Sequence, residues 1–316
     1  MKSRRKFIKH AGVMAAGSLL VPYACTPKKS GEGEADTLAT DNTDELLNKA
    51  GKDMGLQLYT LRNEINNDGL EATLEKVAGI GYQWMEGFGY ENGKILGKSP
   101  QEFSKIITDL GMSLPSMHAV TELTTSGGKS AIMDAMRQAA EDSKTAGAQY
   151  LVYAYLNETE RTSLDDYKRH AETFNQFGEI CQEVGLQFAY HNHDFEFETF
   201  EDTIAYDYLI ENTDSNLVKF ELDLYWITKA GFNPIEYFEK ANGRIELWHV
   251  KDMNNQDEKF FAPVGQGIID FEAIFAKKDV SGMKFFFVEQ DQTKEQPPIE
   301  AITDSYKFLN TAEFVS

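Results

Sequence analysis

Two histidines and two acidic residues follow one short apolar run, in the stretch from residue 185 to residue 197. Two of the six histidines of the chain, His191 and His193, occur there two positions apart. In an extended chain this spacing places both imidazoles on one face. They can share a metal ion, or one can bind a metal while the other contacts a substrate. A hydrogen-bonded histidine pair without a metal is the alternative. Glu196 is a candidate base, or a residue that supports the site from behind.

Three other apolar runs also end in residues of the types that can bind metal ions. Asp223 closes the run 218–223, His249 lies near the end of 245–250 with Lys251 just beyond it, and Glu289 closes 284–289. A carboxylate at the end of a buried strand is costly unless it is paired or ligating. Mixed histidine and carboxylate ligands suit Mn, Zn, Fe or Co rather than Ca. We therefore predict one divalent-metal site at these strand ends.

Four more polar residues occur at or near predicted strand ends. Gln57 and Tyr59 are predicted to share one face of the first strand, Glu86 ends the second, and His118 ends the third. Recognition of substrate hydroxyls is one interpretation of these four residues. The alternatives are a polar cap on the barrel mouth, a salt-bridged acid and a structural histidine.

The elements that must position these residues alternate regularly from residue 53 onward. Eight β-rich runs, most of them continuously apolar as buried parallel strands are, alternate with helical patterns; they are 55–60, 83–86, 113–118, 150–155, 186–191, 218–223, 245–250 and 284–289. A glycine precedes the strand after five of the helices, at Gly81, Gly111, Gly147, Gly185 and Gly282, as expected at the left-handed end of a helix.

Eight strand–helix units in one domain predict an α/β fold, the (β/α)8 TIM barrel, with its site at the carboxyl ends of the strands. A doubly wound open sheet is the rival fold. It would carry a glycine-rich phosphate loop after its first strand, where this chain has Leu61-Arg62-Asn63-Glu64.

The first 52 residues are not part of this pattern. Residues 1–25 contain Arg4-Arg5 and then an apolar stretch too short to span a bilayer, which predicts a twin-arginine-type export signal. Ala24 before Cys25 fits a lipobox while Pro22 and Tyr23 do not, so we expect either lipidation of Cys25 or cleavage nearby. Residues 26–52 are predicted to be a flexible tether with a short helix at 41–50, and 53–316 to be the barrel domain. The predicted location is periplasmic, with a lipid anchor to a membrane.

The net charge of the chain is −20 although its first 25 residues contain only basic charges. Such an acidic chain strongly disfavours nucleic acid as a partner, because phosphate binding requires a basic surface. The same charge disfavours binding to an anionic membrane surface, so contact with a membrane is expected only through the lipid anchor. Cys181 lies on an apolar helix face and is predicted to be a core residue, so no disulfide is expected. The oligomeric state stays open, with a homo-oligomer as one option.

The chain resembles the xylose isomerase-like TIM-barrel superfamily, the sugar phosphate isomerase/epimerase group. The resemblance covers about 53–316, and the segments that carry it are 57–62 (QLYTLR), 190–193 (YHNH), 223–226 (DLYW), 249–252 (HVKD), 265–267 (GQG) and Glu289. It implies one divalent metal, with manganese favoured and zinc, cobalt, iron or magnesium as alternatives. Asp223, His249 and Glu289 match three ligands of the family. His191 stands where a glutamate is common, and Trp226 where a histidine is frequent.

The resemblance implies proton abstraction next to a carbonyl in a keto sugar, with Glu289 as base and His193, Lys251 or Glu196 as the second proton-transfer group. The metal ligands would be His191, Asp223, His249 and Glu289. Gln57, Tyr59, Glu86, His118 and Trp226 would bind the sugar substrate. The product is that of an isomerase or epimerase, or of a lyase that eliminates from a 3-keto sugar. From another class, a non-catalytic exported sugar-binding lipoprotein is the rival, and the acidic charge disfavours a nuclease.

Overall fold

The computed structural model describes residues 52–120, 128–256 and 258–315. The predicted export signal, the helix at 41–50 and all of the predicted tether except Lys52 lie outside these residues, so those predictions remain untested. No helix in the described part of the chain is long and apolar enough to cross a membrane.

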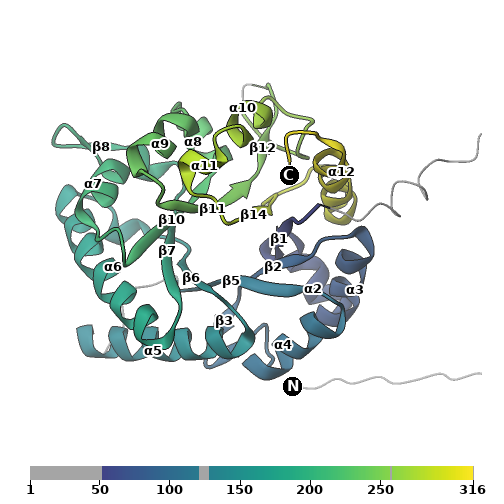
Figure 1. The fold of residues 1–316 in the computed structure, drawn as a ribbon, viewed down its shortest axis with the longest axis horizontal. Helices are drawn as coiled ribbons and strands as arrows, with labels where there is room; N and C mark the ends of the chain where they lie inside the picture. Colours follow the sequence, from purple (N-terminus) through teal and green to yellow (C-terminus); the bar gives the residue numbers. More distant parts are fainter. Residues whose placement is uncertain (1–51, 121–127, 257, 316) are drawn as a thin grey trace, which may run out of the picture. The chain divides into compact units, whose positions relative to one another are not determined.

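Eight parallel strands form a closed barrel, which confirms the predicted fold (Figure 1). Around the barrel the order is β1-β14-β11-β10-β7-β6-β5-β2, so each strand pairs with its neighbours in the sequence. The strands are β1 (Gly55–Gln57), β2 (Trp84–Gly87), β5 (Ser113–Val120), β6 (Tyr150–Tyr153), β7 (Gln187–His191), β10 (Val218–Asp223), β11 (Ile245–Val250) and β14 (Phe285–Val288). The bounds of β10 and β11 are those predicted from the sequence.

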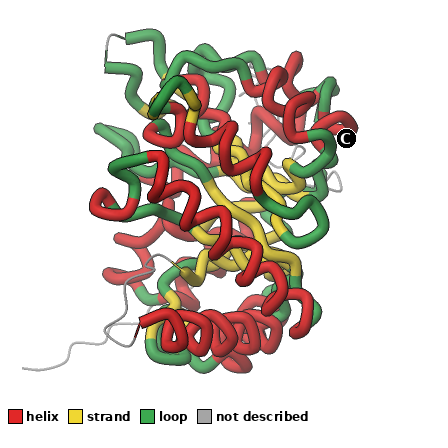
Figure 2. Tube along the Cα trace, turned by 90° about the vertical axis from the view of Figure 1, so that its left-hand side faces the viewer, coloured by secondary structure: helices red, strands yellow, loops and turns green. Residues whose placement is uncertain are grey.

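Helices surround the strands on the outside of the barrel, and Figure 2 shows them as a red layer around the yellow strands. The longer ones are α3 (Leu70–Ile80), α4 (Pro100–Asp109), α5 (Gly128–Ala146), α6 (Leu164–Val184), α7 (Ala205–Asn212), α9 (Pro234–Ala241) and α12 (Pro298–Thr311). Shorter ones are α2 (Arg62–Asp68), α8 (Leu224–Lys229), α10 (Phe271–Phe275) and α11 (Lys278–Ser281). Three 3-10 turns are η1 (Leu58–Leu61), η2 (Glu158–Glu160) and η3 (Phe195–Phe197).

Local sequence signals set the ends of several helices. The Ser99 hydroxyl accepts a hydrogen bond from the Glu102 backbone N–H, and the Glu102 side chain accepts one from the Ser99 N–H, which completes the predicted capping box. Asn233 and Asp270 cap α9 and α10. All five glycines predicted to end helices have positive φ, between 76° and 117°.

The first strand is shorter than predicted. The Gln57 side chain accepts a hydrogen bond from the Tyr59 N–H, and the chain turns there into η1. Tyr59 therefore does not continue the strand, and the prediction that it shares a strand face with Gln57 is wrong. Three two-stranded hairpins were also not predicted: β3–β4 (Tyr90–Glu91 and Lys94–Ile95), β8–β9 (Thr199–Phe200 and Thr203–Ile204) and β12–β13 (Asp252–Met253 and Phe261–Ala262).

Two apolar clusters make up the core. The larger one includes Cys181, as predicted, and lies mainly between the strands and the helices. The smaller one contains Tyr150, Val152, Ala189, Leu247 and Phe287, each from a barrel strand. Strand side chains alternate between two faces with period two. The residues two positions after Ala189, Leu247 and Phe287 are His191, His249 and Glu289, which therefore lie on the same face. The smaller cluster thus forms an apolar layer directly beneath the polar residues of the site.

Candidate metal centre and substrate pocket

Four side chains from the ends of four adjacent strands present ligand atoms that all lie within 4.8 Å of one another. They are His191, Asp223, His249 and Glu289, the four residues predicted to bind the metal, and we call them the pocket cluster. Each is buried, with at most 5% of its surface exposed. The barrel brings them together because β7, β10, β11 and β14 are consecutive in its strand order.

His191 presents a lone pair to this cluster. Its Nδ1 lies 3.1 Å from the backbone carbonyl oxygen of Ala154. A carbonyl oxygen only accepts, so Nδ1 carries the proton. Burial, with the neighbouring His249, lowers the pKa of His191 to about 4, so the ring is neutral at pH 7. Its Nε2 is then an acceptor, and it faces the Asp223 Oδ2 at 3.4 Å.

The two oxygens of Asp223 have separate partners. Oδ1 accepts hydrogen bonds from the backbone N–H groups of Tyr225, at 2.9 Å, and Trp226, at 2.8 Å, and so caps α8. Oδ2 faces the cluster, 3.4 Å from His191 and 3.6 Å from the His249 Nδ1. The cap fixes the carboxylate so that one oxygen always faces the imidazoles.

Lys251 supplies a positive charge beside the cluster. Its Nζ lies 3.0 Å from Asp223, 2.7 Å from Glu289 and 2.9 Å from Asp291. Burial alone would lower the pKa of Lys251, but the three carboxylates outweigh it and raise the pKa well above its usual value. Glu289 has a lowered pKa: burial opposes the shift, while Lys251 and His249 cause it. At neutral pH the lysine is therefore an ammonium and Glu289 a carboxylate.

These residues fit a divalent ion. The His191 Nε2 lone pair faces the Asp223 Oδ2 at 3.4 Å, an arrangement that a cation bound between the two atoms would stabilise. The His249 Nδ1 is also buried and makes no hydrogen bond with any described residue, although the Glu289 Oε2 lies 2.8 Å away. Two imidazoles and two carboxylates are the ligands that Mn, Zn, Fe and Co accept.

A second group of two histidines and two carboxylates adjoins the first and shares His249 with it. This inner cluster contains Glu86, His118, Glu221 and His249. The His249 Nε2 lies 2.6 Å from Glu86, and the His118 Nε2 lies 2.6 Å from Glu221. Two atoms bound at about 2.1 Å to one ion stand about 3 Å or more apart, so these contacts are hydrogen bonds. Glu86 thereby supports a metal ligand from behind, as a carboxylate often does.

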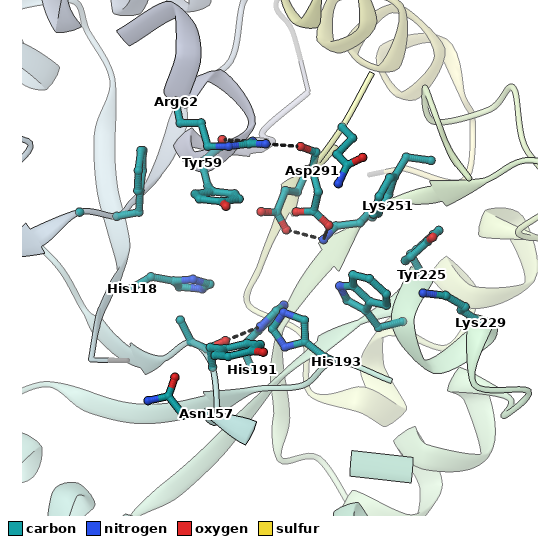
Figure 3. A pocket seen from close by; sticks show the side chains of 18 of the residues that line it. Tyr59, Arg62, His118, Asn157, His191, His193, Tyr225, Lys229, Lys251 and Asp291 are labelled. Atoms are coloured by element: carbon teal, nitrogen blue, oxygen red, sulfur yellow. Dashed lines mark hydrogen bonds and ion pairs between the residues drawn. The ribbon is translucent and has the colours of Figure 1, made fainter. Parts of the chain in front are cut away.

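A cavity of about 840 Å³ opens above the pocket cluster. Figure 3 shows His191, His193, Lys251 and Asp291 facing its centre, with His118 on one side and Tyr225 and Lys229 on the other. The lining residues that carry charge or metal-binding groups are Arg62, His118, His191, His193, Lys229, Lys251, Glu258, Glu289 and Asp291. The polar strand ends therefore meet at a pocket large enough for a small molecule.

Three of the five predicted substrate-binding residues line this cavity: Tyr59, His118 and Trp226. The other two do not, and their assignment is corrected. Gln57 and Glu86 are fully buried, and the Gln57 amide donates a hydrogen bond to Glu86 at 2.8 Å. Glu86 also accepts one from the Ser116 hydroxyl at 2.5 Å. Both side chains are thus hydrogen-bonded in the polar layer below the pocket, and neither lines the cavity.

The two remaining proton-transfer candidates from the opening stretch differ in position. His193 lines the cavity, and burial lowers its pKa well below the usual value, so it is a neutral imidazole. Glu196 is fully buried away from the cavity lining. It accepts hydrogen bonds from the Tyr190 hydroxyl and from the His193 N–H. These contacts favour the alternative prediction for Glu196, a residue that supports the site by positioning the backbone of His193, over proton transfer.

Two residues at the site were not assigned a role from the sequence. Asp291 lines the pocket and pairs with Lys251, and its spacing two residues after Glu289 was a usable signal. Asn192 is fully buried; its Oδ1 accepts a hydrogen bond from the Asp223 N–H at 3.1 Å, and its Nδ2 donates to the His193 carbonyl. It ties the end of β7 to the end of β10. Nothing in the sequence distinguishes this asparagine from one in a turn.

Comparison with known proteins gives a consistent family. The model of the xylose isomerase-like TIM barrel matches residues 74–312. A solved structure described as a sugar phosphate isomerase/epimerase from Parabacteroides distasonis is 29% identical, with a TM-score of 0.75; the match covers 84% of this chain and 100% of that one. A structure of a protein named IolI with a bound zinc atom superposes with a TM-score of 0.65 at 21% identity, covering 84% of this chain and 98% of that one. At that identity the likeness shows the fold alone.

Curated relatives include inosose dehydratases. The one from Lacticaseibacillus casei is 28% identical over 165 residues, which is 46% of this chain and 54% of that protein. One from Clostridium beijerinckii is 30% identical over 156 residues, 44% of this chain and 49% of that protein. This chain therefore matches about half the length of these relatives.

Proposed function

Because the chain belongs to the xylose isomerase-like TIM barrel family, we propose that it is a metal-dependent isomerase or epimerase acting on a keto sugar. The reaction is removal of a proton from the carbon next to the carbonyl. One observation carries the proposal: the His191 lone pair faces the Asp223 carboxylate at the edge of a pocket that Glu289 and Lys251 also line.

His191, Asp223, His249 and Glu289 would hold the ion, with manganese favoured and zinc, cobalt, iron or magnesium as alternatives. When bound, a divalent ion supplies a Lewis acid that polarises the substrate carbonyl. Glu289 is ionised and takes the proton. The Lys251 ammonium stabilises the negative charge that develops on the substrate oxygen. His193, a neutral imidazole in the pocket wall, accepts a proton from a substrate hydroxyl, and the protonated Glu289 returns its proton to carbon.

A lyase is the second candidate, and one residue favours it. His191 occupies the position of a ligand that is commonly a glutamate, so Glu289 is the sole carboxylate of the pocket cluster besides the helix-capping Asp223. Elimination of water or an alcohol needs one base and one acid, which the Glu289 carboxylate and the Lys251 ammonium supply. The similarity to inosose dehydratases supports this candidate.

Proton exchange tests the proposal directly. Metal-loaded protein is incubated in D2O with a panel of keto sugars, and proton NMR records deuterium at the carbon next to the carbonyl. We expect exchange with at least one sugar and a large loss of exchange in Glu289→Gln. A conjugated ketone with its ultraviolet absorption identifies a lyase, whereas a stereoisomer or an aldose–ketose pair identifies an epimerase or isomerase. Metal-bound protein that exchanges no sugar would instead indicate a non-catalytic sugar-binding protein.

We also propose that the protein is exported and anchored by a lipid on Cys25. The paired arginines and apolar stretch of residues 1–25 support this proposal. Fractionation of cells that express the full chain tests it: the wild type should be found with the membrane, and Cys25→Ser should be released in soluble form. Wild-type protein retained in the cytoplasm contradicts export.

A further inference from the structure

The pocket is larger than a single sugar ring bound at the metal-binding and proton-transfer residues would fill. The metal-binding and proton-transfer residues occupy its centre, while aromatic side chains extend its walls. Its volume of about 840 Å³ lies in the upper part of the range of about 300–1,000 Å³ that takes drug-sized ligands. A single sugar ring therefore fills only part of it.

One wall is formed by two pairs of aromatic residues from separate segments. Tyr225 and Trp226 belong to α8, and Phe260 and Phe261 belong to β13 and the residue before it. The rings of Tyr225 and Phe261 stack with their centroids 4.4 Å apart, and Trp226 meets Phe261 edge-on at 5.8 Å. Such a wall suits the flat apolar face of a second ring, because stacked and edge-on contacts are favourable.

The lysine and arginine side chains that line the pocket are already engaged. In the described part of the chain they are Arg62, Lys229 and Lys251. Lys251 pairs with three carboxylates, and Lys229 lies 3.2 Å from Asp194 and over the Trp226 ring. Arg62 donates hydrogen bonds to the carbonyl oxygens of Tyr59 and Asp291 and stacks over the Tyr59 ring. A substrate phosphate would have to displace one of these partners.

The backbone site that could hold a phosphate is also filled. TIM barrels often bind phosphate at backbone N–H groups in the loops after their last strands. In this chain the Asp252 carboxylate accepts hydrogen bonds from the N–H groups of Gly265 and Gly267, each at 2.9 Å, and of Ile269 at 3.2 Å. An internal carboxylate thus occupies the position of an anion in the glycine loop.

We infer that the substrate is an uncharged glycoside, a keto sugar that carries a second ring, and not a sugar phosphate. The inference rests on the proposed function for the sugar end and on the aromatic wall for the second ring. The keto sugar lies against His191, His193, Lys251 and Glu289, and the second ring lies against Phe261 and its aromatic neighbours.

Binding measurements on the metal-loaded full chain test this inference. The probes are the 3-keto forms of methyl and phenyl glucosides, the 3-keto forms of methyl and phenyl galactosides, and glucose 6-phosphate. Within each sugar, the methyl and phenyl glycosides differ only in the group on the glycosidic oxygen. Calorimetry or tryptophan fluorescence gives the dissociation constants. We expect a phenyl glycoside to bind about three- to tenfold more tightly than the matching methyl glycoside, as one added aromatic contact predicts, and the phosphate to bind no more tightly than the methyl glycoside.

Two phenylalanine variants provide the matched comparison. Phe261→Ala should remove the preference for the phenyl glycoside and leave methyl glycoside binding nearly unchanged. Phe308→Ala removes a half-exposed phenylalanine of α12 outside the pocket lining and should retain the preference. Equal binding of the two glycosides, or tighter binding of the phosphate, overturns the inference. A phenyl preference without any deuterium exchange supports the second-ring site and contradicts the proposed reaction.

Discussion

The pocket cluster and the inner cluster have the same composition, two histidines and two carboxylates, and they share His249. Their spacing differs. In the inner cluster both histidines approach a carboxylate to 2.6 Å. In the pocket cluster Asp223 lies 3.4 and 3.6 Å from His191 and His249, and Glu289 lies 2.8 Å from the His249 Nδ1. The contacts with Asp223 leave room for a metal ion, whereas the 2.6 Å contacts of the inner cluster have room only for a proton. Composition alone therefore does not identify a metal site.

The two clusters also differ in whether a lysine or arginine pairs with their carboxylates. Lys251 pairs with Asp223 and Glu289 of the pocket cluster. Among the residues that the structure describes, Glu86 and Glu221 form ion pairs with histidines and with no lysine or arginine. Burial would lower the pKa of His118, but these two carboxylates outweigh it and raise the pKa to about 9. In the inner cluster protons on imidazoles thus balance the carboxylates.

The largest expected effect comes from removing the charge of Asp223. In Asp223→Asn the amide oxygen can still cap α8, so the fold is kept, while the charge that faces His191 is lost. Metal affinity should fall about a hundredfold or more, beyond the range seen for residues behind a ligand. Titration against a metal-binding dye measures it. Asp291→Asn, which also changes a partner of Lys251 but no residue of the pocket cluster, should keep the metal. Equal affinity in both variants would remove Asp223 from the ligand set.

A smaller loss is expected from Glu86→Gln. Glu86 accepts the hydrogen bond from the His249 Nε2 and so leaves the Nδ1 lone pair for the ion. A neutral amide holds the ring less firmly, and metal affinity should fall about 10- to 100-fold. The control is Glu246→Gln, which lies on the same strand as His249 and outside both clusters. Wild-type affinity in Glu86→Gln would mean that the inner cluster does not support the metal.

Glu221→Gln separates the two carboxylates of the inner cluster. Glu221 lies 2.6 Å from the His118 Nε2 but 3.3 Å from the His249 Nε2, so its main partner is not a ligand. We expect metal affinity to change by no more than about threefold, or about 0.7 kcal/mol. The same titration as for Glu86→Gln measures it. A loss as large as that of Glu86→Gln would show that the inner cluster acts as one unit, in contrast to the division proposed here.

The pocket cluster was predictable from the sequence and the inner cluster was not. His191, Asp223, His249 and Glu289 each end an apolar run, and the barrel places such ends at one rim. Residues of the inner cluster come from β2, β5, β10 and β11, and their pairing across the barrel depends on which way each side chain points. Gln57 and Glu86 were assigned to substrate for the same reason, because position on a strand does not show depth in the barrel.

The strand bounds were predictable where a glycine or a buried run sets them, as in β10 and β11. The end of β1 was missed because the Gln57 side chain accepts a hydrogen bond from the Tyr59 N–H and ends the strand early. The direction of the Glu196 side chain was missed for a similar reason, because it accepts a hydrogen bond from the His193 N–H instead of facing the pocket. Such contacts between a side chain and a nearby backbone group compete with the regular pattern, and the sequence pattern does not rank them.

Asn192 supports the pocket cluster only through the backbone, so its removal should have a small effect on metal binding. In Asn192→Ala the Asp223 N–H and the His193 carbonyl both lose a buried partner, at a cost of about 1–3 kcal/mol in the free energy of unfolding. For a domain of this size each kcal/mol corresponds to about 2–4 °C in melting temperature, which calorimetry records. The metal ligands all remain, so affinity for the ion should fall only a few-fold, well below the effect of Glu86→Gln. Asn192 bonds to the main chain of the ligand Asp223, whereas Glu86 bonds to the ring of the ligand His249. A larger loss of metal affinity in Asn192→Ala than in Glu86→Gln would therefore mean that the strand ends, and not the inner cluster, control the metal site.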